Sequence, residues 1–368
     1  MSDIFDLSDE LGPEKVLHLT NAAAGLKAVL VIDNTAAGPS IGGVRMASDV
    51  TVEECARLAR AMTLKNAAAG LPHGGGKAVI VGDPSVPELE KMTLIRAFSD
   101  AIAEMHGYIP GPDMGTNESC MAWVRDEIGR AVGLPRVLGG IPLDEIGATG
   151  FGIAVAAEVA ESFCNVRLDG ARVAIQGFGA VGKHAARHLI HRGARLVAVS
   201  DSGGTVLNPG GLPLAELITL KDAGKSVTAL PGAAKDPGEA AITADCDILI
   251  PAARPDAITE DNVDGVKAQL IIEGANIPAR AAAETALHDR GVLVVPDFIA
   301  NAGGVICASV EYHGGTEATA FHAIEEKIRR NTNEVLKRAS DTDSAPRTVA
   351  RALALERVRE AMGFRRFT

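Results

Sequence analysis

The stretch ARVAIQGFGAVG, residues 171–182, decides the fold. Its first six residues form a short apolar run that predicts a buried strand, and the glycines follow at once. A helical pattern then runs to Gly193. A strand, this glycine spacing and a helix are typical of a dinucleotide-binding fold, in which the helix N-terminus faces a pyrophosphate. The residues expected to bind the dinucleotide here are Gly177, Gly179, Ala180, Val181 and Gly182.

Asp201 supports this prediction from the end of the next strand. It lies 24 residues after Gly177 and closes the apolar run RLVAVSD, residues 195–201. An acid at this place suits both ribose hydroxyls of NAD and would repel the 2′-phosphate of NADP. A bare strand-to-helix turn is the alternative interpretation, and the complete fingerprint makes it the weaker one. The sequence therefore predicts NAD as the cofactor.

The pattern of strands and helices extends the fold in both directions. Apolar runs at residues 246–253, 268–276 and 292–297 alternate with helical segments, which indicates a Rossmann-type doubly wound parallel sheet. Nearer the N-terminus, strands are expected at 26–33 and 77–82, with a helix between them. We therefore expect a mixed α/β region followed by the parallel sheet.

The length and the glycine distribution predict two domains. A chain of 368 residues is too long for one ordinary core. Residues 138–152 are dense in glycine and are expected to form a hinge. The predicted fold is therefore α/β, with an N-terminal domain over residues 1–135 and an NAD-binding Rossmann domain over 136–339. After residue 316 the pattern is helical, interrupted at 340–347.

Composition excludes several classes of function. The net charge is −11 and no Lys/Arg block stands out, so nucleic acid is an unexpected partner. The acidic N-terminus lacks the features of a signal peptide, and no run approaches the ~18 apolar residues of a membrane span. The five cysteines are scattered, which argues for a reducing compartment and against a thiolate metal site. We expect a cytoplasmic protein with no membrane partner and no metal.

A second glycine-rich stretch, GLPHGGGKAVIVGDP at residues 70–84, raises the question of what Lys77 does. A phosphate-binding P-loop would need glycine at Leu71 and a hydroxyl residue at Ala78. Because both are missing, Lys77 is not predicted to hold a phosphate.

Six motifs together explain this lysine. They are GPSIGGVRM (38–46), MTLKNAAAGLPHGGGKAVI (62–80), PGPDMGT (110–116), GATGFG (147–152), EGAN (273–276) and IANAGGVI (299–306). In this order they resemble the glutamate/leucine/phenylalanine/valine dehydrogenase family over nearly the whole chain. The resemblance implies reversible oxidative deamination of an L-amino acid to a 2-oxo acid and ammonia. It also implies a large homo-oligomer built through the N-terminal domain, with helices from about 340–368 returning to that domain.

The resemblance gives the remaining site residues their roles. Lys65 would supply positive charge to the substrate's α-carboxylate, and a buried Lys77 near a second cation would act as the base. Asp113 would exchange protons with the substrate nitrogen and the departing water. Taken alone, each of these residues is more often structural, and it is their occurrence beside a dinucleotide site that favours catalysis. Three further residues are expected at the nicotinamide: Thr149, Asn276 and Asn301, of which Asn276 could contact substrate instead.

Two positions bear on the substrate. In glutamate-specific members of the family, a lysine and a serine meet the side-chain carboxylate, and here those positions are Ile41 and Ala308. Neither can stabilise a second carboxylate, and stranding such a charge in a dry pocket costs several kcal/mol. We therefore expect Ile41, Gly42, Val305 and Ala308 to bind an apolar side chain, and the pocket positions resemble those of leucine dehydrogenases.

The choice of substrate leaves alternatives open. Leucine, valine and isoleucine lead, and phenylalanine stays possible because discrimination by one methylene is worth only about 1–3 kcal/mol. The segments IPGPDMGTN and GGIPLDEIGATGFG are more similar to glutamate dehydrogenases. A glutamate dehydrogenase with a rearranged side-chain site, or a catalytically silent nucleotide sensor, are therefore the rival hypotheses.

Overall fold

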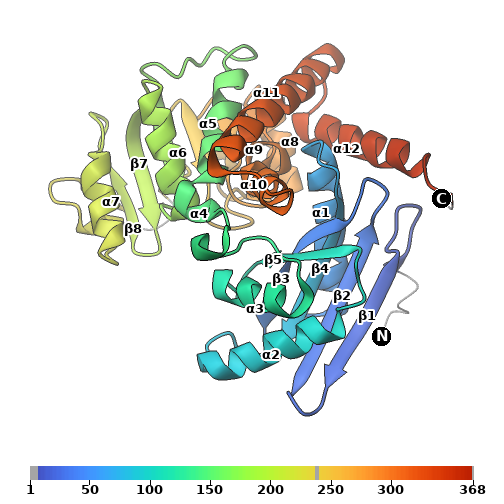
Figure 1. Cartoon of the computed structure of the whole chain (residues 1–368). Coiled ribbons are helices and arrows are strands. Elements are labelled where there is room, and N and C mark those ends of the chain that lie inside the picture. Colours follow the sequence, from blue (N-terminus) through green and yellow to red (C-terminus); the bar gives the residue numbers. More distant parts are fainter. Residues whose placement is uncertain (1–6, 237–239, 367–368) are drawn as a thin grey trace. The chain divides into compact units, whose positions relative to one another are not determined.

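The computed structural model describes residues 7–236 and 240–366 (Figure 1). The chain divides into two compact units. The first comprises residues 1–143, 305–320 and 351–368, and the second comprises 144–304 and 321–350. We expected domain boundaries at 135/136 and 339/340. The structure differs in that residues 305–320 also belong to the first unit. The chain passes between the two units four times, each time inside a helix. Turn signals in the sequence mark only loops, so they do not indicate these boundaries. The helices are α4 (Leu143–Ile146), α10 (Gly303–Tyr312), α11 (Glu317–Thr342) and α12 (Pro346–Met362).

A five-stranded mixed sheet forms the centre of the first unit, in the order β1-β2-β4-β3-β5. The strands β1, β2 and β4 pair antiparallel, whereas β3 is parallel to both β4 and β5. The strands are β1 (Lys15–Asn21), β2 (Leu26–Asn34), β3 (Ser40–Ala47), β4 (Gly74–Val81) and β5 (Tyr108–Pro112). The glycines Gly74–Gly76, expected in a loop, belong to β4.

Helices cover both faces of this sheet (Figure 1). Apolar residues of α2 (Glu88–Ala101) and α3 (Glu118–Ile128) pack with Leu30, Met46 and Ile80 on one face. Cys55 and Ala59 of α1 (Val52–Ala68) pack with Val29, Val31 and Val79 on the other. Thr51 caps the start of α1, since its hydroxyl accepts a hydrogen bond from the Glu54 amide at 3.1 Å.

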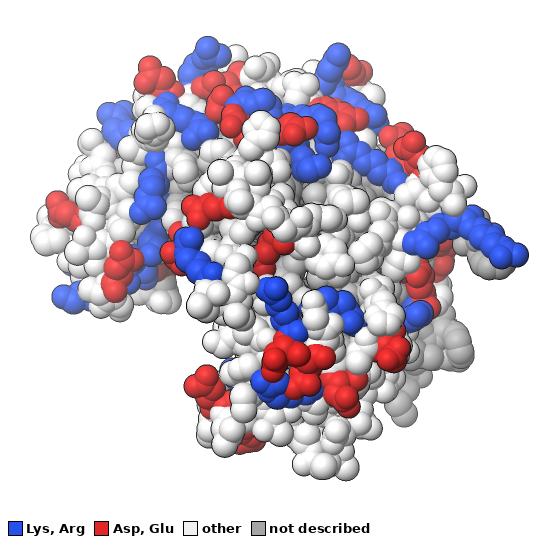
Figure 2. Space-filling model, in the orientation of Figure 1, with Lys and Arg blue, Asp and Glu red and all other residues white. Residues whose placement is uncertain are grey.

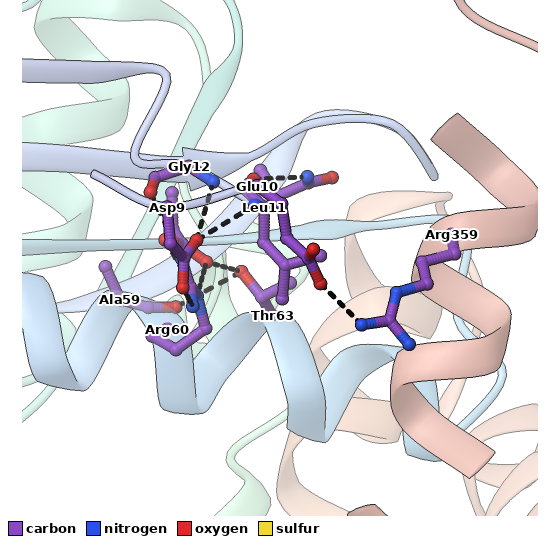
Figure 3. Close-up of polar contacts among 10 residues, drawn as sticks. Asp9, Glu10, Leu11, Gly12, Ala59, Arg60, Thr63 and Arg359 are labelled. Carbon is purple, nitrogen blue, oxygen red and sulfur yellow. Dashed lines mark hydrogen bonds and ion pairs between the residues drawn. The ribbon is translucent and has the colours of Figure 1, made fainter. Parts of the chain in front are cut away.

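A network of charged groups fixes α1 against β2 (Figure 3). The buried Asp33 carboxylate at the end of β2 accepts from Arg60 Nε at 2.9 Å and from Thr63 Oγ1 at 2.6 Å. Arg60 also pairs with Asp9 through both terminal nitrogens at 2.7 Å, which ties the N-terminal segment to the same helix. Because two side chains one turn apart bind one carboxylate, the helix has a fixed rotation about its axis.

A seven-stranded sheet forms the centre of the second unit, in the order β12-β11-β10-β6-β7-β8-β9. Five strands are parallel, as expected for a doubly wound sheet, while β8 and β9 add an antiparallel edge that the sequence patterns missed. The strands are β6 (Arg172–Gln176), β7 (Arg195–Asp201), β8 (Gly204–Leu207), β9 (Ala234–Asp236), β10 (Ile248–Pro251), β11 (Leu270–Ile272) and β12 (Leu293–Val295).

Residues 138–152, the glycine-dense segment that we expected to form a hinge, are largely helical. That segment holds a 3₁₀ turn (Arg136–Leu138), the short α4 and the start of α5. Gly150 lies inside α5, where an added Cβ would come within 2.5 Å of the Ala185 amide of α6. The absence of a side chain at Gly150 therefore permits α5 and α6 to pack closely. The second unit also contains the helices α5 (Ala148–Ala160), α6 (Ala180–His191), α7 (Leu214–Asp222), α8 (Ala281–Asp289) and α9 (Asp297–Ala300).

The surface carries charges of both signs, and no disulfide joins the cysteines of the described residues. Basic and acidic side chains are interspersed over the face shown in Figure 2. All five cysteines are free thiols. Within residues 7–236 and 240–366, no helix is both long and apolar enough to cross a membrane.

Candidate active site

Three neighbouring strands present one face of the first unit's sheet as a site. Side chains alternate along a strand, so Ile41, Gly43 and Arg45 of β3 share a face. The register pairs Gly43 with Gly111 of β5 and Val44 with Ala78 of β4. Gly43 therefore lies between Lys77 on one side and β5 on the other, and neither Gly43 nor Gly111 covers the sheet with a side chain.

Lys77 and Asp113 meet across this bare strip. Lys77 Nζ donates to Asp113 Oδ2, and the two side chains are only 8% and 18% exposed. Burial opposes ionisation of the Asp113 carboxyl, but the charge and hydrogen bond of Lys77 outweigh it and hold the pKa of Asp113 below its usual value. The Met114 amide also donates to Asp113 Oδ1 at 2.7 Å. The site therefore holds a buried ammonium–carboxylate pair.

Arg45 is a charged neighbour that our sequence analysis missed. Its Nε lies 3.5 Å from Asp113 Oδ2, and its Nη1 lies 2.5 Å from Glu54 Oε1 of α1. Its place two residues after Gly43, on the same strand face, is the signal that could have identified it. Arg45 gives Asp113 a second cationic neighbour.

The other end of the same face is apolar. Ile41, Ile109, Val132 and Ala308 form one buried cluster in which α10 packs against β3 and β5. Ile41 and Ala308, which lie far apart in the sequence, are thus brought into one cluster. Val305, one turn earlier on α10, is half-buried. The face therefore changes from charged groups at Arg45 and Asp113 to aliphatic groups at Ile41.

The remaining predicted residues of the first unit have clear local settings. Lys65 is half-buried in the last turn of α1, and the buried side of that turn is formed by Thr63, Asn66 and Ala67. Asn66 Nδ2 donates to the Gly74 carbonyl at 2.7 Å, which ties this turn to β4. A Cβ on Gly42 would overlap the Gly76 carbonyl, so close strand packing accounts for that glycine.

The three glycines of the turn between β6 and α6 have different local settings. Gly177 has a φ of +98°, which L side chains rarely adopt, and a Cβ on Gly182 would lie 2.1 Å from the Gly177 carbonyl oxygen. Gly179 borders open space instead, and it is the N-cap of α6 with no capping side chain. Ala180 is exposed and Val181 half-buried beside it. Gly177 thus serves the turn and Gly182 the close packing of α6, while Gly179 leaves open space at the N-terminus of α6.

Asp201 has a different setting from the one we expected. Its Oδ1 accepts from Ser226 Oγ at 2.7 Å and from the Gly203 amide at 2.9 Å. Its Oδ2 accepts from Lys221 Nζ at 2.6 Å and from the Val227 amide at 2.9 Å. Burial raises its pKa, but these donors outweigh burial and the net shift is downward. The carboxylate is ionised and already accepts four hydrogen bonds from its own chain.

The residues expected at the nicotinamide lie on three segments: Thr149 in α5, Asn276 after β11 and Asn301 at the end of α9. Asn276 is exposed in the turn after β11, and its Oδ1 accepts from Asn301 Nδ2 at 3.1 Å. Asn301 is only 4% exposed, so it supports the turn from below. Thr149 is half-buried in the first turn of α5, where the start of α10 packs closely against it at Gly303.

Comparison with protein families now decides the relationship. Residues 13–130 match the Glu/Leu/Phe/Val dehydrogenase dimerisation domain, and residues 139–366 match the Glutamate/Leucine/Phenylalanine/Valine dehydrogenase family. The chain belongs to this family. The resemblance inferred from the six motifs is confirmed, and the protein is an amino acid dehydrogenase that uses NAD or NADP.

Individual relatives refine the comparison. The NADP-specific glutamate dehydrogenase of Saccharolobus shibatae is 40% identical over 89% of this chain and 82% of its own. The NAD-specific glutamate dehydrogenase of Staphylococcus aureus strain COL is 38% identical over 84% of this chain and 77% of its own. The structure of hetero-hexameric glutamate dehydrogenase from Thermus thermophilus, in a leucine-bound form, is 32% identical, with a TM-score of 0.84 over 95% of this chain and 89% of that one.

These relatives correct one part of the sequence analysis. We expected the pocket to resemble leucine dehydrogenases most, but the named relatives at 38–40% identity are glutamate dehydrogenases. The motif positions we weighed are few, whereas identity counts the whole chain. The relatives also include both NAD- and NADP-specific enzymes, so family membership leaves the cofactor at NAD or NADP.

Proposed function

We propose that this dehydrogenase oxidises an apolar L-amino acid, of the leucine, valine and isoleucine class, to its 2-oxo acid and ammonia. The observation that carries the substrate class is the buried cluster of Ile41, Ile109, Val132 and Ala308 on the face that holds Lys77. A charged side chain placed against this cluster would lose its hydration without gaining a partner from it, at a cost of several kcal/mol. An aliphatic side chain would gain from the same burial.

The chemistry uses the polar end of the same face. Lys65 binds the α-carboxylate, and Asp113 exchanges protons with the substrate nitrogen. Lys77 acts as the base toward the water that attacks the imino carbon after oxidation. The Lys77–Asp113 pair supports these roles, because it brings together, on one buried strip of the sheet face, an amine and a carboxylate, which are the groups that proton exchange with the substrate requires.

The nucleotide is proposed to bind at the glycine turn of the second unit. Gly177, Gly179, Ala180, Val181 and Gly182 would hold the pyrophosphate at the N-terminus of α6, and Thr149, Asn276 and Asn301 would orient the nicotinamide. When bound, the cofactor accepts the hydride from the substrate Cα. We propose NAD because Asp201 keeps a negative charge next to the expected ribose position. Its internal hydrogen bonds make repulsion of a 2′-phosphate, rather than a direct ribose contact, the basis for that proposal.

Glutamate is the second candidate substrate, and the names of the relatives favour it. For glutamate to be preferred, a basic group outside the Ile41–Ala308 cluster would have to meet the side-chain carboxylate. We also propose a cytoplasmic homo-oligomer, since the matched N-terminal model is described as a dimerisation domain and a similar solved enzyme is hexameric.

The experiment that tests the chemistry is NADH and NADPH formation against a panel of L-amino acids, with Lys77→Ala and Lys65→Ala beside the wild type. We expect Lys77→Ala to abolish turnover and to leave NADH affinity nearly intact, because the glycine turn is unchanged. Lys65→Ala should chiefly raise KM for the amino acid. Reversed phenotypes would overturn the role assignment, and a wild type that turns over no amino acid would overturn the function.

A further inference from the structure

The turn that carries Asn276 is conformationally strained. Ile277, the next residue, has a φ of +48° although it is β-branched, and its side chain is 57% exposed. Such a backbone conformation is unfavourable for a residue that is not glycine, and it persists only where neighbouring groups enforce it. An exposed isoleucine gains little from burial here, so the enforcement must come from hydrogen bonds to the backbone.

Asp297 supplies this enforcement on the amide side of Ile277, while the Asp256 amide donates to the Ile277 carbonyl at 3.0 Å. Asp297 Oδ2 accepts the Ile277 amide at 2.9 Å, and its Oδ1 accepts Arg347 Nη1 at 2.9 Å. Asp297 is 4% exposed and is the first residue of α9. Oδ2 therefore holds the strained turn, while Oδ1 holds the carboxylate itself in place.

Arg347 is in turn held on every side. Its Nε donates to both oxygens of Glu284, at 2.8 and 2.6 Å, and its Nη2 donates to the fully buried Glu273. The ring of Phe298 lies under the guanidinium, with 5.7 Å between Cζ and the ring centroid. Glu273 Oε2 also accepts the Asp297 amide at 2.9 Å. One arginine from the start of α12 thus links three carboxylates on three other segments.

We propose that Asp297 and Arg347 are positioning residues that hold the Asn276 side chain in its working orientation. The path runs from the guanidinium through Asp297 to the Ile277 amide, and Asn301 fixes the Asn276 amide from the other side. With its oxygen bound by Asn301, Asn276 presents its NH₂ group as a donor. This inference rests on the proposed function, in which Asn276 contacts the nicotinamide ribose or the substrate.

The test is a double-mutant cycle on kcat/KM for the best amino acid of the panel, using Asn276→Ala, Asp297→Ala and the double variant. Asp297→Ala should lower kcat/KM by about tenfold or more, since small misplacements of a contacting group are costly. In the Asn276→Ala background the same change should cost less than about twofold, because the side chain that Asp297 positions is already gone.

Two further variants separate positioning from general stability. Ile277→Gly removes the strain, because glycine adopts positive φ readily, and it should restore most of the activity lost in Asp297→Ala. Arg347→Lys should retain more activity than Arg347→Met. Glu158→Gln is the matched control: Glu158 bridges Arg192 and Arg329 in the same unit, and its loss should change kcat/KM by less than about twofold.

The outcomes are distinct. Additive losses in the Asn276/Asp297 cycle, or no rescue by Ile277→Gly, would overturn the inference while leaving the proposed function intact. If the wild type turns over no amino acid, the proposed function fails, and hydrogen–deuterium exchange of the Ile277 amide decides the inference alone. Faster exchange in Asp297→Ala than in Glu158→Gln would support it, and equal exchange would reject it.

Discussion

At the scale of single residues, a glycine allows a buried lysine to reach its counter-ion. An ammonium group inside a sheet face is costly unless a carboxylate meets it. Gly43 lies between the strands of Lys77 and Asp113, and a Cβ there would come within 2.7 Å of the Asp113 Cβ and 2.9 Å of the Pro112 carbonyl oxygen. The missing side chain is thus the condition for the ion pair.

Gly43→Ala should therefore impair catalysis without touching a charged group. The added methyl must displace Asp113 or β5, and we expect kcat to fall at least about tenfold, with little change in NADH affinity. Gly107→Ala is the control, because its Cβ would meet only Thr35 at 3.9 Å. Steady-state kinetics of both variants measure this, and a Gly43→Ala enzyme with wild-type kcat would refute the argument.

Single residues also show what the sequence could and could not predict. Lys77 and Asp113 were identified because each lies in a motif, and the structure brings them into contact. Arg45 lies in a motif too, but its link to Asp113 depends on strand register, which single-sequence patterns leave open. Asp201 was identified by spacing alone, and spacing says nothing about the four donors that surround it.

At the scale of elements, α10 connects the apolar cluster that contains Ala308 to the chain segment between Leu134 and Ile141. Ala308 packs against Ile41 and Val132, and one turn later the buried Glu311 accepts the Leu134 amide at 3.1 Å and the Ile141 amide at 3.0 Å. Burial raises the pKa of Glu311, and these amide donors only partly offset that effect. Glu311 thus fixes α10 relative to one wall of the proposed pocket.

Glu311→Ala should therefore loosen the pocket. Two buried N–H groups would lose their acceptor, at about 1–3 kcal/mol each in unfolding free energy. We expect KM for leucine to rise severalfold with a small change in kcat, and Glu311→Gln, which keeps one acceptor oxygen, to lie between Ala and the wild type. Denaturant unfolding and initial rates measure both effects. A wild-type KM in Glu311→Ala would contradict this account of the pocket wall.

Element prediction succeeded where local patterns decide and failed where tertiary contacts do. The run at 195–201 became β7 with those bounds because its apolar residues are buried in the sheet. Gly74–Gly76 were expected in a loop, yet they form the start of β4, since β2, β3 and α1 approach too closely for side chains. Gly150 lies inside α5 for the same reason, because α6 approaches too closely for a side chain there. Turn signals in the sequence do not indicate such a tertiary contact.

At the scale of the whole molecule, buried charge makes stability depend on pH. In the second unit, Arg347 faces Glu273, Glu284 and Asp297, so one cation serves three carboxylates. Burial raises the pKa of Glu273 well above its ordinary value of 4.5, and burial raises that of Glu284 as well. At these two carboxyls the folded chain therefore binds more protons than the unfolded chain above about pH 4.5.

The upward pKa shifts of Glu273 and Glu284 predict that the free energy of unfolding falls toward alkaline pH. The contribution of a raised carboxyl pKa is fully present below the unfolded value and is lost as pH rises through the folded value. We expect Glu273→Gln, which keeps the shape without the charge, to flatten the fall of the thermal unfolding midpoint as the pH rises above about 4.5. Glu104→Gln, whose side chain is 88% exposed, should follow the wild type. A steeper fall in Glu273→Gln would contradict the assignment.

The substrate class is tested most directly by the ratio of kcat/KM for L-leucine to that for L-glutamate in the wild-type enzyme. The apolar cluster of Ile41, Ile109, Val132 and Ala308 predicts a ratio of at least ~100, because an unpaired carboxylate buried there costs several kcal/mol. A ratio below one would show that glutamate is preferred and that a basic group outside this cluster meets the side chain.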